Sequence, residues 1–214
     1  MARNVFAVAR LQGSLGDQIA ADLAHDFGIP LVERQILEAA AESAGVSPET
    51  IGEVERVPSF LERMLEYLGH HSGGLDPLGN FPMEQTTPFL LSTDSYRSLI
   101  ENVLKKTAQE ADSVIVGHGG AIFLRDVPYV FRVLITAPFD IRARRLQEHE
   151  NLSHEEAVHK LRADDKNRVD YFQTYYKVNW LNPALYDLAI NTARVDGATA
   201  VDLIKLAQSR IVQE

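Results

Sequence analysis

The 214-residue sequence contains no cysteine, which excludes disulfide bonds and thiolate metal sites. We therefore expect a cytoplasmic protein. The sequence also lacks an excess of basic residues, because its formal net charge is −9 at pH 7. Proteins that bind nucleic acids or anionic membranes nonspecifically carry a basic surface, so we expect neither partner. Any anion must bind at a local basic patch on this acidic chain.

Long apolar runs are missing as well. No stretch approaches the ~20 apolar residues needed to span a bilayer, and Arg10 interrupts the N-terminal apolar run too early for a signal peptide. There is no internal repeat, no G-x-S-x-G motif and no pattern typical of a nucleophile–base triad. The 45% of hydrophobic residues nevertheless suffices for one sizeable core.

Five short and almost continuous apolar runs predict buried parallel strands, at residues 5–9, 29–32, 114–116, 131–136 and 188–190. Helical patterns separate them, at residues 18–27, 34–44, 95–110, 140–149 and 195–212. This alternation predicts a layered α/β fold with right-handed crossovers. Ligands bind such sheets outside the carboxyl ends of the strands, where the glycine-rich segments 13–16 and 117–120 both fall.

The expected organisation is a single domain with two interruptions. Its core comprises approximately residues 1–46, 94–150 and 183–214. Residues 47–93 contain several prolines and predict an insertion that starts as a helix and continues as an irregular loop. Residues 151–182 predict a lid-like helical region, which begins at a capping box formed by Ser153 and Glu156.

The turn after the first predicted strand has the layout of a phosphate-binding loop. A helix that starts directly after such a turn offers unpaired N–H groups and the positive end of its dipole to an anion. The full pattern is G-x-x-x-x-G-K-[ST]. Here Arg10 and Leu15 stand at the two glycines, Gly16 stands at the lysine, and Asp17 replaces the hydroxyl residue that binds Mg²⁺. These substitutions predict altered phosphate chemistry.

Arg10 has two interpretations that the sequence leaves open. It lies at the end of a strand within reach of a phosphate, where it would supply the charge of the missing lysine. Alternatively, it pairs with a carboxylate such as Glu33 or Asp17.

A second group of basic residues lies on two later helices. Arg142 and Arg145 share one helix face, and Arg162 and Lys166 share another. Guanidinium groups bind phosphate in a bidentate fork, so this cluster suits a phosphoryl group in transfer. The alternative is a solvated surface with ordinary ion pairs to the neighbouring carboxylates, Glu148, Glu150, Asp164 and Asp165.

Two further clusters have structural interpretations that we favour. Trp180 and the tyrosines at 171, 175 and 176 are expected to pack a helix onto the core rather than to stack on a base. His70, His71 and Asp76 contain metal-binding groups, but adjacent histidines on a loop point in different directions, so we expect no metal there.

Five segments together resemble the cytidylate kinase-like family, a branch of the P-loop nucleoside monophosphate kinases. Residues 9–20 are similar to S-R-Q-x-G-S-G-G-R-E-I-A, residues 28–34 to G-I-P-x-x-D-R, residues 114–120 to V-I-V-G-R-G/C-G/A, residues 165–172 to D-K-x-R-x-x-Y-Y, and residues 186–192 to Y-D-L-x-I-N-T. These segments run over nearly the whole length of the chain in the order and spacing of the family.

The resemblance implies a P-loop kinase-like three-layer sandwich, with a five-stranded parallel sheet, a helical insertion and a lid. It implies ATP-dependent phosphorylation of a pyrimidine nucleotide such as CMP, with ATP and Mg²⁺ as cofactors. The expected phosphate-binding residues are Arg10, Gly13, Ser14, Gly16 and Asp17. Acceptor binding is assigned to Asp165, Lys166, Gly117 and His118, and catalysis to Arg142, Arg145, Arg162 and Arg168.

Three departures from the family motifs keep other functions open. Leu15 brings a side chain where the backbone should approach phosphate, Asp17 places an anion there, and His118 replaces an arginine. Loss of one preorganised charge donor typically costs about 10²–10³ in rate. The first alternative is therefore a non-catalytic module that binds a nucleotide or another phosphate ligand. The second is an interaction protein that forms a homodimer through residues 47–93.

Overall fold

A computed structural model describes residues 3–44, 47–48 and 93–211 of the chain. Most of the predicted insertion, including His70, His71 and Asp76, lies outside the described residues.

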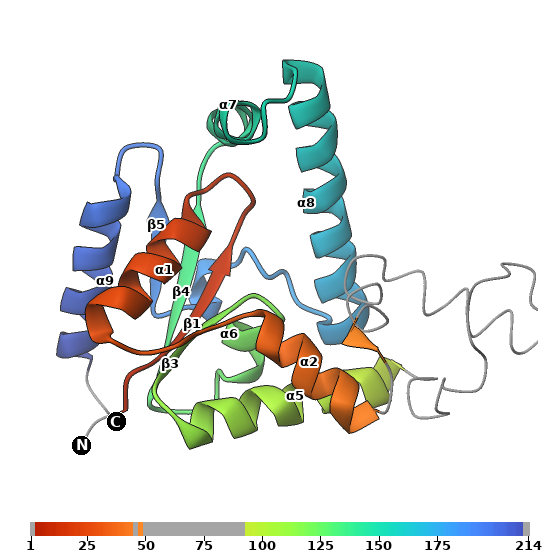
Figure 1. Cartoon of the computed structure of the whole chain (residues 1–214), viewed down its shortest axis with the longest axis vertical. Helices are drawn as coiled ribbons and strands as arrows, with labels where there is room; N and C mark the ends of the chain where they lie inside the picture. Colours follow the sequence, from red (N-terminus) through yellow and green to blue (C-terminus); the bar gives the residue numbers. More distant parts are fainter. Residues whose placement is uncertain (1–2, 45–46, 49–92, 212–214) are drawn as a thin grey trace, which may run out of the picture.

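A five-stranded parallel sheet forms the centre of the molecule (Figure 1), as the sequence predicts. Its strands are β1 Val5–Arg10, β2 Leu31–Val32, β3 Ser113–Val116, β4 Val130–Thr136 and β5 Leu188–Asn191, in the order β2-β3-β1-β4-β5. Strand β1 lies in the middle, where Val8 pairs with Val116 on one side and Val133 on the other. Strand β2 is shorter than predicted, because Pro30 has no N–H to donate to a ladder.

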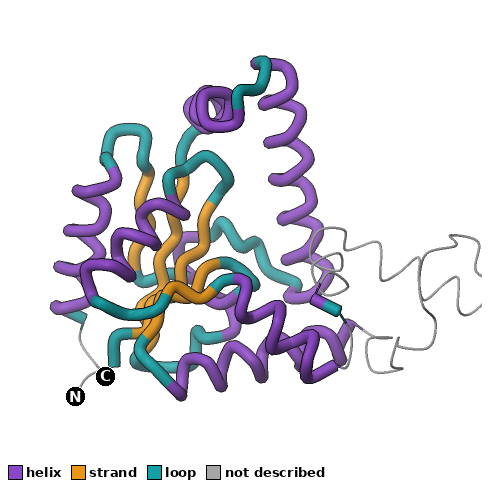
Figure 2. The backbone as a smooth tube through the Cα atoms, in the orientation of Figure 1, coloured by secondary structure: helices purple, strands orange, loops and turns teal. Residues whose placement is uncertain are grey.

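Helices cover both faces of the sheet and complete three layers (Figure 2). They are α1 Gly16–Phe27, α2 Arg34–Ala44, α5 Thr93–Glu110, α6 Gly120–Phe123, α7 Phe139–Glu150, α8 His154–Tyr176 and α9 Gly197–Arg210. Phe6 and Val8 of β1 pack against α1 and α9, whereas Val5 and Ala7 pack toward α2, α5 and α6. This alternation of side chains explains why the strand is apolar throughout.

The helix ends lie where capping residues place them, and some of them differ from the ends that apolar periodicity predicts. Helix α1 stops at Gly28, which adopts the expected left-handed conformation at φ 63°. Helix α9 starts two residues later than predicted, because the Asp196 carboxylate caps it by accepting the Thr199 N–H at 2.8 Å. It stops at Arg210, and Ile211 is extended.

Helices α7 and α8 form a hairpin that projects beyond the sheet (Figure 1). Ala143, Leu146, Ala157 and Leu161 make a small apolar cluster between them. Helix α8 is 23 residues long in total. Its last turns pack in the main core through Tyr171, Phe172, Tyr175 and Tyr176. One helix therefore connects the projecting hairpin to the body.

Replacement of Ser153 by alanine should destabilise the fold by about 1 kcal/mol, because it removes the N-cap of α8. In the confirmed capping box, Ser153 Oγ accepts the Glu156 N–H, and the Glu156 carboxylate accepts the Ser153 N–H at 2.8 Å. Urea unfolding of Ser153→Ala measures the loss. Ser209→Ala, at the exposed end of α9, serves as a control and should stay within about 0.5 kcal/mol of wild type.

The difference in unfolding free energy between wild type and Ser153→Ala should depend on pH. Hydrogen bonds from Ser153 lower the pKa of Glu156 below its usual value. A carboxyl with a lowered pKa stabilises the fold above its unfolded-state pKa, and this contribution disappears as the pH falls through the folded-state pKa. The stability difference between wild type and Ser153→Ala should therefore narrow in acid, and a constant difference would contradict this assignment.

Candidate functional site

Residues 11–15 form the glycine loop, which connects β1 to α1. Gly13 has φ 74°, and a Cβ there would lie 2.7 Å from the Arg142 carbonyl oxygen, so only glycine fits against α7. Leu15 also adopts a left-handed conformation, with φ 66°, although it carries an exposed side chain. The expected conflict at Leu15 is therefore present: the backbone has a conformation that glycine adopts at lower cost.

Three consecutive carbonyl groups of the glycine loop are bound by side chains. Arg142 Nη1 donates to Gln12 O and Arg145 Nη1 donates to Gly13 O, both at 3.3 Å. The Thr192 hydroxyl donates to Ser14 O at 2.8 Å. These donors come from α7 and from the end of β5, so the loop backbone is held from one side.

The N–H groups of the same region are largely unpaired. Among the described residues, the N–H groups of Gly13, Leu15, Gly16 and Asp17 have no acceptor. Ser14 Oγ is fully buried and has no hydrogen-bond partner there either. Unpaired N–H groups at the start of α1, together with its dipole, make this loop suitable for an anion.

The stem of Arg10 occupies the space that a side chain at position 16 would need. A Cβ on Gly16 would lie 2.3 Å from Arg10 Cβ, and a Cβ on Gly117 would lie 2.7 Å from Arg10 Nη1. The arginine therefore extends over Gly16 from the glycine loop to the end of β3. Glycine at position 16 leaves the space that the stem of Arg10 fills.

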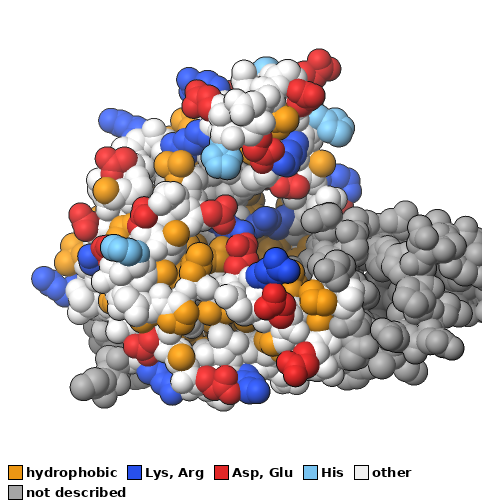
Figure 3. Space-filling view, in the orientation of Figure 1, with side chains coloured by type: hydrophobic (Ala, Val, Ile, Leu, Met, Phe, Trp, Pro, Cys, Tyr) orange, Lys and Arg blue, Asp and Glu red, His pale blue; other side chains and the backbone are white. Residues whose placement is uncertain are grey.

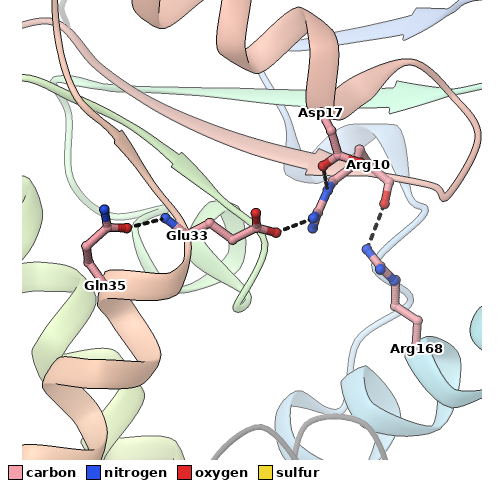
Figure 4. Close-up of polar contacts among 5 residues, drawn as sticks. All are labelled: Arg10, Asp17, Glu33, Gln35 and Arg168. Atoms are coloured by element: carbon pink, nitrogen blue, oxygen red, sulfur yellow. Dashed lines mark hydrogen bonds and ion pairs between the residues drawn. The ribbon is translucent and has the colours of Figure 1, made fainter. Parts of the chain in front are cut away.

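Two carboxylates hold the Arg10 guanidinium group (Figure 4). Arg10 Nε donates to Asp17 Oδ1 at 2.6 Å, and Arg10 Nη2 donates to Glu33 Oε1. The Glu33 N–H in turn donates to Gln35 Oε1 at 3.1 Å. The alternative in which Arg10 pairs with carboxylates is thus confirmed, while its contact with a phosphate stays a prediction.

A cavity of about 330 Å³ opens beside Arg10 at the carboxyl ends of β1 and β3. It is lined by Ala9, Arg10, Glu33, Leu37, Gly117, His118, Gly119, Gly120, Ala121, Ile122, Asp164, Asn167, Arg168, Tyr171, Phe172, Trp180 and Tyr186. Gly117, His118 and Gly119 are consecutive left-handed residues, with φ 75°, 50° and 72°. Residues 117–120 line the cavity, whereas residues 13–16 do not, so their meeting at one crevice stays a prediction. On this face, basic and acidic side chains lie side by side (Figure 3).

Arg168 reaches the cavity from α8 and is partly buried. Its Nη1 donates to the Arg10 carbonyl oxygen at 2.7 Å, and its guanidinium lies 5.4 Å from the centroid of the Trp180 ring. Burial lowers its pKa below the usual value, and the charge of Arg10 lowers it further. Since Arg168 has no ion pair among the described residues, an anion in the cavity would compensate its charge.

Other predicted site residues lie outside the cavity lining. Arg142 is buried and forms a bidentate ion pair with Asp165, at 3.0 and 2.7 Å. Lys166 is exposed and pairs with Asp170. Arg162 is exposed and lies 6.0 Å from the centroid of the Phe139 ring. Arg145 binds the loop and Thr192, and the catalytic and acceptor-binding roles of these residues stay predictions.

Three residues that line the cavity, Glu33, Asp164 and Asn167, are not among the site residues predicted from the sequence. Residues 164, 167, 168, 171 and 172 all line the cavity, and their spacing is that of one helix face. This periodicity, combined with the conspicuous Arg168, could have identified Asp164 and Asn167. The sequence predicts Glu33 only as an ion-pair partner of Arg10, and the structure confirms this contact.

The aromatic residues pack as expected. Tyr171, Tyr175, Tyr176 and Trp180 are buried, and the Trp180 ring stacks on Phe172 with 5.3 Å between centroids. Trp180 also lines the cavity, so packing and ligand contact are compatible at that residue.

Within the described residues, no group of three or more acidic, histidine or cysteine side chains is arranged to hold a metal ion. Mg²⁺ does not require such a group, because it commonly binds one or two carboxylates together with substrate phosphates. Asp17 is the carboxylate nearest the start of α1, its side chain is exposed, and the Ser14 hydroxyl is unpartnered. Binding of Mg²⁺ by these two groups stays a prediction.

No helix in the described part of the chain is long and apolar enough to cross a membrane.

Comparisons with known proteins agree with this architecture. The chain is 28% identical over 97 residues to a cytidylate kinase of Haloarcula marismortui, covering 45% of this chain and 50% of that protein. It is 23% identical over 133 residues to a cytidylate kinase of Desulfurococcus amylolyticus, covering 62% and 71%. The first alignment thus spans half the length of that relative.

Solved structures share the fold. An uncharacterized protein from Eubacterium ventriosum superposes with a TM-score of 0.67 at 22% identity, covering 98% of this chain and 100% of that one. A gluconokinase from Sinorhizobium meliloti gives a TM-score of 0.50 at 12% identity, with 98% and 93% covered. The model of the cytidylate kinase-like family matches residues 5–194, so the chain belongs to this family.

Proposed function

We propose that this protein is an ATP-dependent phosphotransferase of the nucleoside monophosphate kinase type, with a pyrimidine nucleotide such as CMP as acceptor. The position of Arg10 carries the proposal. Its side chain extends from the start of α1, where unpaired N–H groups suit a donor phosphate, to the edge of the cavity, which suits an acceptor. A cation between donor and acceptor lies where phosphoryl transfer needs it.

The donor side of this site depends on the backbone. The N–H groups of Gly13, Leu15, Gly16 and Asp17 would bind the phosphates of ATP. Bound Mg²⁺ would neutralise phosphate charge, with Asp17 and Ser14 as its ligands. Arg10 would then replace the lysine of the ordinary loop.

The acceptor side is the cavity. Its volume of about 330 Å³ lies at the lower end of the range for ligand pockets. Arg168 supplies a positive charge without an ion pair among the described residues, and Asp164 and Asn167 offer polar groups for the remainder of the acceptor. The matched relatives are named cytidylate kinases, and 23–30% identity to them supports the same acceptor class.

Transfer in such a site requires no covalent enzyme intermediate. The protein's residues position the two substrates and stabilise charge on the transferring group. Arg10 and Arg168 both line the cavity, where they would supply the stabilising charges.

A non-catalytic phosphate-binding module is the second candidate. The observation that favours it is the double ion pair of Arg10, because Asp17 and Glu33 already compensate its charge. Such a module would bind nucleotide without transferring phosphate.

The direct test is transfer of the γ-phosphate from ATP–Mg²⁺ to a panel of nucleoside monophosphates. Transfer should depend on the acceptor and fall about 10²–10³-fold in Arg168→Ala, because a preorganised charge is lost. Arg125→Ala is the matched control, since Arg125 is exposed and pairs with its neighbour Asp126. Folded wild-type protein that binds ATP without transfer to any acceptor would favour the binding module.

Leu15→Gly should bind ATP more tightly than wild type. The change relieves the left-handed leucine and removes its side chain from the phosphate side, while the greater flexibility of glycine in the unfolded chain offsets the gain in stability. Titration calorimetry gives the affinity. Lys177→Gly is the matched control, because Lys177 has φ 56° at the end of α8 and should leave ATP affinity unchanged.

The contact between Arg10 and Gly16 predicts strong coupling between two substitutions. Gly16→Lys alone should destabilise the protein by about 1–3 kcal/mol and weaken ATP binding, because the new side chain collides with Arg10. Arg10→Gly alone should weaken ATP binding through loss of charge. The double variant restores both space and charge, so its ATP affinity should exceed that of either single variant. Additive effects in this double-mutant cycle would contradict the replacement of lysine by Arg10.

A further inference from the structure

We propose that Asp165 acts on the donor side of the site, where it positions the glycine loop through Arg142, and not on the acceptor. Arg142, Arg145 and Thr192 are positioning residues in the same network. This inference rests on the proposed function, because it assumes that the glycine loop binds the donor phosphates.

The first step concerns peptide geometry. Each peptide group is trans, so the carbonyl of one residue and the N–H of the next point in opposite directions. Arg142 binds Gln12 O and thereby directs the Gly13 N–H away from α7. Thr192 binds Ser14 O and likewise directs the Leu15 N–H away from itself. Both N–H groups lack an acceptor among the described residues, so these contacts determine which side of the loop receives an anion.

The second step concerns what holds Arg142. Its side chain is 5% exposed and donates to Asp165 through two nitrogens and to Ala137 O through Nε at 3.1 Å. A planar fork bound on this many sides has a fixed orientation. Asp165 is its carboxylate partner, so Asp165 controls the direction in which Arg142 meets Gln12 O.

Arg145 supports the same segment from the next turn of α7. Its guanidinium donates to Gly13 O, to Thr192 Oγ1 at 2.9 Å and to Thr192 O at 2.7 Å. Since Thr192 Oγ1 also binds Ser14 O, Arg145 orients the hydroxyl that holds the third loop carbonyl. Arg142 and Arg145 thus each donate one hydrogen bond to the loop backbone.

The third step separates Asp165 from its neighbour. Asp164 lines the cavity, whereas Asp165 does not and instead faces α7 through Arg142. The two adjacent carboxylates on α8 thus act on different substrates. Asp164 acts on the acceptor, and Asp165 acts on the donor through Arg142. The pair offers an internal comparison with the same chemistry, the same helix and consecutive positions.

The experiment measures ATP–Mg²⁺ and CMP binding separately, by calorimetry on the full chain, for wild type, Asp165→Asn and Asp164→Asn. Asp165→Asn should weaken ATP binding about tenfold, as expected when a hydrogen bond between charged groups is lost, and leave CMP binding unchanged. Asp164→Asn should alter CMP binding and leave ATP binding unchanged. A role limited to fold stability would lower both affinities together or neither, and would overturn the proposal.

Thr192→Val keeps the test decisive if Asp165→Asn fails to fold. It removes the hydroxyl from the loop network without burying an unpaired charge. It should weaken ATP binding and spare CMP binding, and weakened CMP binding with unchanged ATP binding would overturn the proposal.

Failure of the proposed function gives a different result. Wild type that binds ATP without transferring phosphate refutes the kinase, but Asp165→Asn must still weaken ATP binding if our inference holds. Wild type that binds neither ATP–Mg²⁺ nor pyrophosphate refutes both.

Discussion

The site is organised around the close contact between the stem of Arg10 and the Cα of Gly16. A side chain at position 16 would occupy the same space as Arg10 Cβ, so this placement of Arg10 requires glycine at position 16. From this contact the guanidinium extends to Asp17, Glu33 and the turn at Gly117. The Arg10 guanidinium thereby connects the loop with the ends of β2 and β3. The carboxylates of Asp17 and Glu33 alone would not connect these segments, because like charges repel.

A second group of cations holds the other side of the loop. Arg142 and Arg145 are anchored on α7 and bind carbonyl oxygens, while Arg10 and Arg168 lie toward the cavity. Four arginines thus have two different tasks within one small region. An arginine cluster near a phosphate loop is therefore insufficient evidence that every member contacts phosphate.

Much of the fold could be predicted from the sequence because its signals are local. Apolar runs located all five strands, Gly28 ended α1 and the Ser153–Glu156 pattern began α8. The family motifs also identified the glycine-rich segment 117–120, which lines the cavity. The two-residue length of β2 depends on Pro30 and on its place at the sheet edge, which periodicity does not report.

The contacts within the candidate site were harder to predict, because they join distant segments. Gln12 and Arg142 lie 130 residues apart, and Ser14 and Thr192 lie 178 apart. Helical spacing correctly predicted that Arg142 and Arg145 lie on one helix face. It does not indicate whether that face contacts a ligand or the backbone of the glycine loop. Asp164 and Asp165 are identical in chemistry and adjacent in sequence, and their different surroundings depend on the rotation of α8 against the body.

The uninterrupted course of α8 has a consequence for how the α7–α8 hairpin can move. Its 23 residues include neither glycine nor proline, so the helix offers no internal hinge. Left-handed residues flank it instead, with Asn151 before it and Lys177 after it. Any outward swing of the α7–α8 hairpin must turn the helix as one piece about these ends. Such a swing would pull Arg168 from β1 and Arg142 from the loop in a single event.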